Sequence, residues 1–534
     1  MLDIIKKKLL DGCSLTDHLH FQTNNYKEYL GNLIILLYEY NNNFTTLELA
    51  KILAVSLTRK DKELSLFLLS NEKYDLPIID KCCSILDSKR EYNQLERDIK
   101  KITKNMLKLK KLKLRMANIL KLYEGLDMSL SSSKIKFIKE NWINKLSSER
   151  LEYMALLYPP NLWKGIIRMF HLKPSDFQLS WFTKYIIMTE YPINSIVGAG
   201  KSLNSENIVH NITKFKLPYD YLRLKHNDLL NEDVKQEIFI YTPLCDVIRY
   251  WHDFENEKIR QMTLDRLLND EEVKMPYGEL IKRIQMLNEN ENNKMIVNKL
   301  ISIAENKLNN YKIHIEDPVV VFGDASGSME MAIKTSSIIT SILVKICNAR
   351  MHLFRDTDEI IDNPPKNVID VLNSVERFQA RDGTAPAASL YPYYERKEVV
   401  KTFILVTDEI ENAPYNEQSF ANVYRKYREE VYPAKLVFIS FLNNNKDGQM
   451  VTDLKHHIPD IEKDIIQFIL NVNNPDLRKL DNLLNLLCIE SGYYNDKYEK
   501  IIKYLGNNNN LDKHTIQDIL NEASIDDIIF KISI

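Results

Sequence analysis

The sequence predicts a multidomain protein in which a HEAT-like α-helical repeat array or ring is followed by an α/β domain with a doubly wound, Rossmann-like sheet. Three observations predict this class. The chain has 534 residues, more than a single hydrophobic core organises. Residues 1–316 show helical periodicity almost throughout. From Asp317 onward, apolar strand-like runs alternate with helical segments.

The N-terminal domain, residues 1–316, is predicted to be all-helical. Leu, Ile, Lys and Glu recur there at intervals of three and four residues, and glycine is sparse. Prolines and glycines interrupt this pattern often enough to leave many short and medium helices, as in a helical repeat. No strict sequence period is present, so the repeat is inferred from the number of helices, and a plain helical bundle is the alternative.

The second domain, residues 317–491, is predicted to hold a parallel sheet with helices on both faces. Residues 318–322 form a continuous apolar run ending in glycine and aspartate, as expected of a buried parallel strand. Further strands are expected at 351–354, 402–407, 435–441 and 465–470, and helices at 329–347 and 417–430. Residues 492–534 are predicted to be a helical tail.

Composition favours a soluble, folded protein, with 44% hydrophobic and 27% charged residues. We find no signal peptide and no apolar run near the ~20 residues that span a bilayer, so we expect a cytoplasmic or nuclear protein with no membrane partner. The six cysteines show no metal or redox spacing and are interpreted as core residues in a reducing compartment.

The net charge of −2 conceals an asymmetry between the two parts of the chain. Residues 317–534 contain 24 Lys and Arg against 33 Asp and Glu, a charge of −9, which leaves 48 against 41, or +7, for residues 1–316. A basic N-terminal part is compatible with polyanion binding, and also with attraction between two oppositely charged domains.

Three loops that follow predicted strands carry oxygen ligands. In open α/β sheets, ligands bind beyond the carboxyl ends of the strands. The candidate metal ligands are Asp324, Ser326, Ser328, Thr384 and Asp408. They form a hard oxygen set suited to a divalent cation, with Mg²⁺ expected. Gly327 is expected to permit the tight turn between the two serines.

The alternative for the first loop is purely structural. Ser326 or Ser328 would then serve as the N-cap of a helix beginning near Met329. Glu409 and Glu411 lie close to Asp408 in sequence and are interpreted as outer groups or solvated charges. No nucleophile, base or histidine cluster accompanies these loops, and His456 and His457 are expected in an exposed loop. No catalytic residue is assigned, and we expect no enzyme.

The metal loops resemble a known motif. Asp-Ala-Ser-Gly-Ser at 324–328, Asp-Gly-Thr at 382–384 and Thr-Asp at 407–408 are similar to the metal-ion-dependent adhesion site of von Willebrand factor A domains. This resemblance implies that an acidic group of a partner completes the coordination of the ion. The site is then a binding device rather than a hydrolytic centre.

Two stretches of the helical half, residues 161–174 and 217–250, resemble the TROVE module of Ro ribonucleoproteins, and residues 424–437 resemble their C-terminal domain. The resemblance implies a helical-repeat ring closed by a von Willebrand A-like domain. It also implies noncoding RNA partners: single-stranded 3′ ends of defective transcripts and small structured cytoplasmic RNAs. No DNA specificity is expected.

Candidate RNA contacts come from the matched stretches and from the most basic segment, residues 97–121, which is predicted to form a single amphipathic helix. They are Lys101, Lys104, Lys108, Lys111, Arg115, Lys164, Arg168, His171, Lys173, Arg223, Lys225 and His226. For the basic helix, three interpretations stay open: an ordinary packed helix with solvated lysines, an RNA-facing helix, and a membrane-surface or partner helix.

The sequence therefore favours an RNA-binding ribonucleoprotein component of the RNA quality-control type with a divalent-metal site. The second hypothesis is a metal-dependent protein-interaction scaffold that captures a carboxylate of a partner at that site.

Overall fold

The protein packs as two compact units. The computed structural model describes residues 2–38, 44–101, 106–123, 126, 128–311, 313, 315–374, 378–443, 447–489, 492–507 and 511–520. The helical unit comprises the described residues of Met1–Tyr40, Phe44–Ile259 and Lys497–Ile534. The α/β unit comprises those of Arg260–Asp496. Packing therefore groups residues 260–316 with the sheet and the end of the chain with the N-terminal helices; the sequence boundaries at 316 and 491 stay a prediction.

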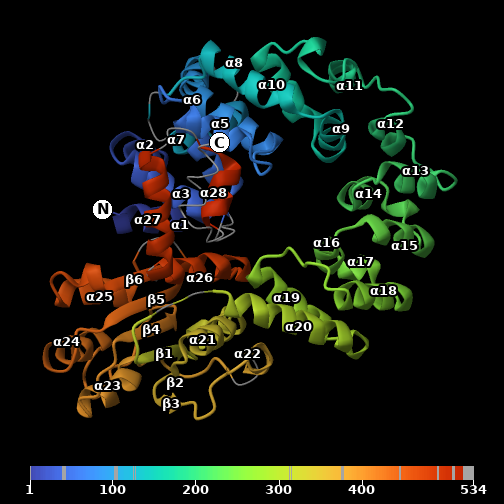
Figure 1. The fold of residues 1–534 in the computed structure, drawn as a ribbon. Helices are drawn as coiled ribbons and strands as arrows, with labels where there is room; N and C mark the ends of the chain where they lie inside the picture. The colour runs from blue at the N-terminus through green and yellow to red at the C-terminus, as the bar shows by residue number, and fades with distance from the viewer. Residues whose placement is uncertain are drawn as a thin grey trace. The chain divides into compact units, whose positions relative to one another are not determined.

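The described helical unit consists of helices alone. They are α1 (Leu2–Asp11), α2 (Leu15–Asn24), α3 (Tyr26–Tyr38), α4 (Thr46–Ser56), α5 (Glu63–Leu69), α6 (Leu76–Lys100), α7 (Met106–Tyr123), α8 (Ser132–Asn141), α9 (Ser148–Leu157), α10 (Pro160–Phe170), α11 (Phe182–Met188), α12 (Ile196–Lys201), α13 (Ile208–Phe215), α14 (Tyr219–Lys225), α15 (Glu232–Tyr241), α16 (Leu244–Arg249), α17 (Trp251–Phe254), α27 (Gly492–Asn507) and α28 (Lys513–Leu520). From α8 to α17 they follow one another in chain order along an array (Figure 1).

Proline marks the turns of successive helix pairs. Pro159, Pro218 and Pro243 are the N-cap residues of α10, α14 and α16, with φ between −62° and −53° and ψ between 135° and 140°. Proline suits this position because its fixed φ leads into a helix and because its missing N–H needs no partner there. Only two or three residues separate the helices of each pair, α9–α10, α13–α14 and α15–α16. The predicted helical repeat is confirmed, and its signature is the position of proline.

The α/β unit carries the predicted sheet. Its strands are β1 (Val319–Asp324), β2 (Arg350–Phe354), β3 (Asp358–Ile360), β4 (Thr402–Thr407), β5 (Lys435–Leu442) and β6 (Ile465–Asn471). Its helices are α18 (Glu257–Leu268), α19 (Tyr277–Asn288), α20 (Lys294–Asn309), α21 (Ile333–Cys347), α22 (Val368–Ser374), α23 (Ala387–Glu395), α24 (Phe420–Glu430), α25 (Gln449–His457) and α26 (Leu480–Ile489). The order of the described strands is β3-β2-β1-β4-β5-β6.

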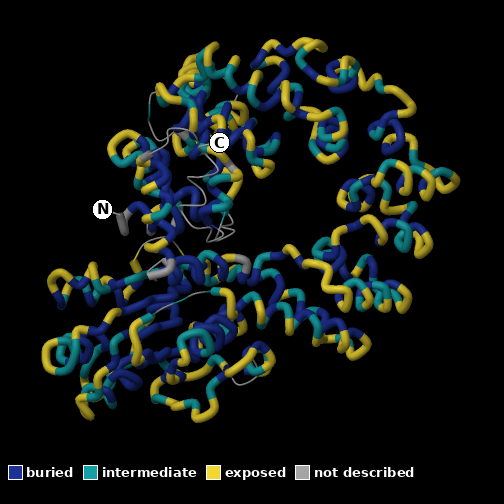
Figure 2. Tube along the Cα trace, viewed as in Figure 1, coloured by how far each residue is buried: buried dark blue, intermediate teal, exposed yellow. Residues whose placement is uncertain are grey.

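Helices cover both faces of this sheet, as predicted. Every residue of β1 and β4 is buried, and Figure 2 shows the central strands as buried throughout. On one face, alternate residues such as Phe322, Phe403 and Phe438 pack with α23, α24 and α25. On the other face, α21 contacts β1 and β4. Alternate side chains of each strand therefore point to opposite faces of the sheet, and each face packs against its own layer of helices.

A buried carboxylate joins α26 to α19. Asp481 accepts hydrogen bonds from the backbone N–H groups of Tyr277 (2.8 Å) and Gly278 (2.9 Å) and from the Tyr311 hydroxyl (3.0 Å). It thus satisfies two of the N–H groups that the first turn of α19 leaves without intrahelical partners. This contact between residues about two hundred positions apart explains why α19 and α20 belong to the α/β unit.

The predicted strands are confirmed at their positions, but four details are wrong. The sheet is mixed, because β3 pairs antiparallel with β2. The helix expected from Met329 begins at Ile333. His456 and His457 end helix α25 instead of lying in a loop.

The fourth correction concerns residues 97–121, which do not form one helix. Helix α6 ends at Lys100, α7 begins at Met106, and α7 packs back on α6, with an ion pair between Arg115 and Glu91. Among the described residues, no helix is both long and apolar enough to cross a membrane.

We predict that Gly278→Ala destabilises the α/β unit. A Cβ at this position would lie 1.7 Å from the carbonyl oxygen of Leu477. Relieving the overlap must separate α19 from the segment before α26, at a cost of about 3 kcal/mol. Gly165→Ala is the control, because its Cβ would meet only an Asp80 oxygen at 3.8 Å. Scanning calorimetry should show a lower melting temperature for the first variant alone; equal melting temperatures would contradict the proposed close approach.

Candidate metal centre

Strands β1 and β4 deliver the two acidic candidates to one place. They pair in parallel, with Gly323 opposite Val406, so Asp324 and Thr407 end the two strands side by side. The Thr407 hydroxyl donates to Asp324 Oδ2 at 2.6 Å. Asp408 is the next residue after β4, and both carboxylates are buried, with 0% and 5% exposed.

The first loop turns back on Asp324. The Ser326 N–H donates to Asp324 Oδ1 at 2.9 Å, and the Ser326 and Ser328 hydroxyl oxygens lie 3.1 Å apart. The Ser328 hydroxyl donates in turn to the Asp408 carboxylate. The two serines therefore lie on the same side of the turn, as predicted.

The helix-cap interpretation of these serines is not supported. Ser326 precedes a short 3₁₀ turn, Gly327–Met329, and its side chain makes no capping hydrogen bond. Gly327 is not in the left-handed region, so its expected role in the turn is wrong. Instead it lies against the middle loop, where its N–H donates to the Asp382 carbonyl at 3.2 Å.

The middle loop is held from both sides. The Arg381 N–H donates to the Ala325 carbonyl at 3.1 Å, which joins it to the first loop. Asn412, from the loop after β4, accepts the Thr384 N–H at 2.8 Å through its side-chain oxygen. The Asn412 N–H returns a hydrogen bond to the Thr384 carbonyl at 3.1 Å. The three ligand-bearing loops are thus connected by hydrogen bonds.

The electrostatics of the site suit a cation. Burial, and then the charge of Asp408, raise the pKa of Asp324 to about 7. Burial also raises the pKa of Asp408 above its usual value. The Thr384 hydroxyl is buried and has no hydrogen-bond partner in the described structure. Two buried carboxyls, two serine hydroxyls and the Thr384 hydroxyl, which has no hydrogen-bond partner in the described structure, are oxygen ligands that fit a hard divalent ion.

The neighbouring glutamates do not serve this site. Glu409 is fully buried in the left-handed region (φ 62°) and turns away, accepting from Gln467 Nε2 at 2.6 Å and the Val451 N–H at 3.1 Å. Glu411 accepts the Phe420 N–H at 2.7 Å. Burial raises the pKa of both carboxyls. Both act as structural acceptors for the starts of α24 and α25.

The sequence interpretation missed Asn412, and it placed Thr407 in the motif without giving its side chain a role. The role of Thr407 follows from the register of β1 with β4, which sets its hydroxyl beside Asp324. Asn412 carried no signal, because its partner Thr384 lies in a different loop.

The candidate RNA contacts are dispersed over the helical unit. Lys101 is exposed at the end of α6, Lys108, Lys111 and Arg115 are exposed on α7, and Lys104 lies outside the described residues. Lys164 is half-buried and Arg168 exposed on α10, followed by His171 and Lys173. Arg223, Lys225 and His226 close α14. The described candidates therefore lie at three places, at the end of α6 and on α7, on and just after α10, and at the end of α14, and the structure does not bring them into one site.

Several of these side chains are already engaged. Arg223 forms an ion pair with Asp253 at 2.7 Å and lies over the Tyr250 ring. His226 Nε2 lies 3.3 Å from the Tyr221 hydroxyl. His171 adopts the left-handed conformation that ends α10. Lys111 and Arg168 are exposed and show no comparable ion pair or hydrogen bond within the described residues, so phosphate groups can reach them more easily.

Comparison with known proteins identifies the fold. The crystal structure of the Ro (RSR) protein of Deinococcus radiodurans matches 83% of this chain and 91% of its own length, with a TM-score of 0.50 and 10% sequence identity. No protein-family model and no curated sequence matches the chain. The predicted combination of a helical repeat with a von Willebrand A-like domain is therefore confirmed as a fold.

We predict that Thr384→Val lowers affinity for Mg²⁺ about tenfold while raising the stability of the metal-free protein by about 1 kcal/mol. The hydroxyl has no protein partner, so its loss removes a desolvation cost but also a ligand. Thr340→Val is the matched control, since its hydroxyl is also buried without a partner but lies on α21. Calorimetric titration and thermal melting check this; unchanged Mg²⁺ affinity would exclude Thr384 as a ligand.

We also predict that metal binding depends on pH. A cation binds the ionised carboxylate, and Asp324 ionises only near pH 7. Affinity for Mg²⁺ should therefore fall up to about tenfold per pH unit below about pH 7. In the metal-free protein the pKa of Asp324 is higher in the folded state than in the unfolded state, so the folded state binds the proton more tightly. The free energy of unfolding therefore falls as pH rises from 3.8 to about 7. A flat pH profile of Mg²⁺ affinity in calorimetry would contradict this.

Proposed function

We propose that this protein is an RNA-binding component of a cytoplasmic ribonucleoprotein and binds small noncoding and misfolded RNA. The observation that carries the proposal is the fold shared with a Ro protein over 83% of the chain. The two stretches that resemble the TROVE module support it, because they form α10 and the segment from α14 to α16 of the helical array.

The physical chemistry of the helical unit supports RNA as the partner. Helix α7 carries five lysines and one arginine and no acidic residue. Its lysines are exposed, and lysines on an extended helical array gain affinity by releasing counterions from phosphates. Leu109, Leu112, Met116 and Ile119 are the more buried apolar residues of this helix and form its inward stripe.

The metal centre belongs to this proposal as a binding site. Asp324, Ser326, Ser328, Thr384 and Asp408 would hold Mg²⁺, which would supply a positive charge to an acidic group of a partner. The glutamates nearest the site are engaged with backbone N–H groups and offer no general base. We therefore propose binding and no catalytic activity.

A second candidate function is a metal-dependent protein-interaction scaffold. The observation that favours it is the exposure of two large apolar side chains beside the metal loops, Met331 (69% exposed) and Ile410 (46%). Apolar groups around a site for an acidic group are typical of protein interfaces.

We predict that the full chain binds single-stranded RNA and that binding weakens steeply with salt. Neutralising four phosphates should reduce affinity about fifty-fold for a fourfold rise in salt. Replacing Lys108 and Lys111 together by Gln should lower the slope of log K against log salt by about 1.4. The control replaces Lys274 and Lys294, which are 76% and 71% exposed in the α/β unit.

Filter binding at several salt concentrations provides the measurement. If no RNA binding is detected at low salt, the RNA proposal is wrong. Asp324→Ala separates the two candidate functions. It should leave RNA affinity unchanged if RNA binds the helical unit, and abolish partner capture if the scaffold hypothesis holds.

A further inference from the structure

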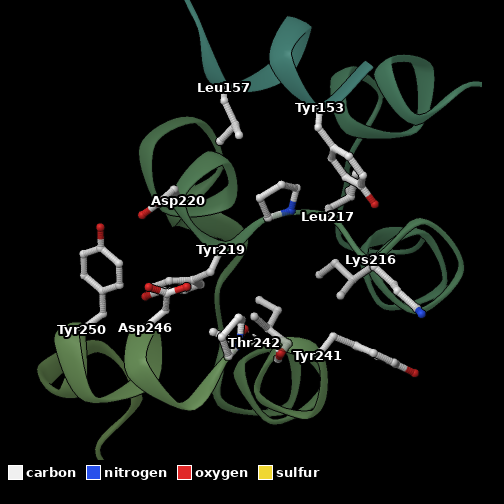
Figure 3. Close-up of a pocket in the computed structure, with 14 residues that line it drawn as sticks. Tyr153, Leu157, Lys216, Leu217, Tyr219, Asp220, Tyr241, Thr242, Asp246 and Tyr250 are labelled. Atoms are coloured by element: carbon white, nitrogen blue, oxygen red, sulfur yellow. Dashed lines mark hydrogen bonds between the residues drawn. The ribbon is translucent and has the colours of Figure 1, made fainter. Parts of the chain in front are cut away.

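A pocket of about 300 Å³ opens in the helical unit between α9 and the turns that precede α14 and α16 (Figure 3). Its walls come from α9, from the α13–α14 turn and from the α15–α16 turn. None of the candidate metal ligands and none of the candidate RNA contacts lines this pocket.

The walls of this pocket are flat and firmly held. The buried Tyr219 ring packs on Phe254 and Tyr250, with ring centroids 4.4 Å and 5.5 Å apart. Pro218 and Pro243 are fixed as helix N-caps. The Tyr153 hydroxyl donates to the Phe215 carbonyl at 2.9 Å. Such rigid aromatic and pyrrolidine faces suit a planar ligand, because little side-chain entropy is lost when one binds.

The two sides of the pocket differ in charge. Asp220, Asp246 and Tyr250 lie on one side, whereas Lys216 and Tyr241 lie on the other (Figure 3). Tyr250 donates to Asp220, and Arg249 contacts Asp246 at 2.5 Å. These contacts orient the carboxylates, and each oxygen can accept more than one hydrogen bond. Lys216 is exposed in the left-handed conformation that ends α13.

The pocket also leaves apolar surface open. Tyr241 and Leu157 are each 39% exposed although both side chains are large and apolar. A ligand that belongs here must therefore be planar and apolar on its faces, carry hydrogen-bond donors at one end and be anionic at the other.

We infer that this pocket binds one nucleotide unit, with the amino edge of the base toward Asp220 and Asp246 and the phosphate toward Lys216. The inference rests on the proposed RNA-binding function and takes the nucleotide from an unpaired segment of RNA. Adenine, cytosine and guanine present amino groups to a carboxylate, whereas uracil presents none. A free nucleotide offers the same chemistry, so the experiment distinguishes the two sources.

The first test compares Asp220→Asn and Asp246→Asn with the unaltered full chain on oligoadenylate, oligocytidylate and oligouridylate in filter binding. Removing a negative charge beside a polyanion should strengthen binding of every RNA if the carboxylates only repel phosphate. If they receive base amino groups, binding of the adenylate and cytidylate oligomers should weaken about fivefold to tenfold, and binding of oligouridylate should not weaken. Tighter binding of all three oligomers overturns the inference.

Matched variants test the other end of the pocket. Lys216→Gln should weaken all three oligomers about threefold, and Lys214→Gln, which removes the same charge from an exposed side chain on α13, should weaken them less. Asp233→Asn, at the opposite end of α15, is the control for the carboxylates and should not distinguish the bases. Thermal melting verifies that each variant is folded, and equal effects of the two lysine variants count against the pocket.

Equilibrium dialysis with AMP and UMP identifies the source of the nucleotide and separates failure of this inference from failure of the proposed function. Oligomer binding with the base-dependent losses supports both. Oligomer binding without them overturns the pocket alone. Binding of AMP in preference to UMP, with no oligomer affinity, supports the pocket and overturns the RNA proposal. Binding of neither oligomers nor AMP overturns both.

Discussion

The parallel pairing of β1 with β4 at the centre of the sheet is the constraint on which the α/β unit depends. Its register sets Asp324 beside Thr407 and brings Asp408 next to both. Burial, and then repulsion by the nearby Asp408 carboxylate, raise the pKa of Asp324 to about 7. The Ser326 N–H in the same loop and the Thr407 hydroxyl at the end of β4 donate to Asp324 and offset part of this cost, and the second donor depends on the pairing of the two strands. The candidate metal site therefore depends on the same strand pairing that forms the core of the sheet.

A second long-range contact decides which helices accompany the sheet. Asp481 caps the first turn of α19 and receives the Tyr311 hydroxyl, so a carboxylate from the last helix of the α/β unit completes a helix that precedes β1. Helix periodicity cannot reveal such a contact, because α19 has the same kind of apolar pattern as the helices of the repeat. Packing thus assigns α19 and α20 to the sheet, although their sequence resembles that of the helical half.

The errors in the sequence interpretation have specific physical origins. Strand β3 (Asp358–Ile360) is three residues long with two acids, so it carries no apolar run, and its place is held by contacts such as that of Asp358 with His352 at 3.0 Å. No proline or glycine lies at the ends of α6 and α7 that border the break, so the residues there did not indicate it. An ion pair of Arg115 with Glu91 connects the two helices where they pack back on each other. His456 and His457 were expected in an exposed loop, yet they form the last turn of α25.

The sequence by itself determined the class of fold and the identity of the five candidate ligands. Buried parallel strands must be continuous apolar runs, and a hard cation requires oxygen donors after strand ends, so both leave local patterns, as at residues 402–408. Only the tertiary structure decided that the Thr384 hydroxyl is left without a partner, that Glu409 and Glu411 turn away, and that the turns at Pro218 and Pro243 enclose a pocket. These features depend on groups far apart in the chain, and their positions are set by packing, which no local pattern encodes.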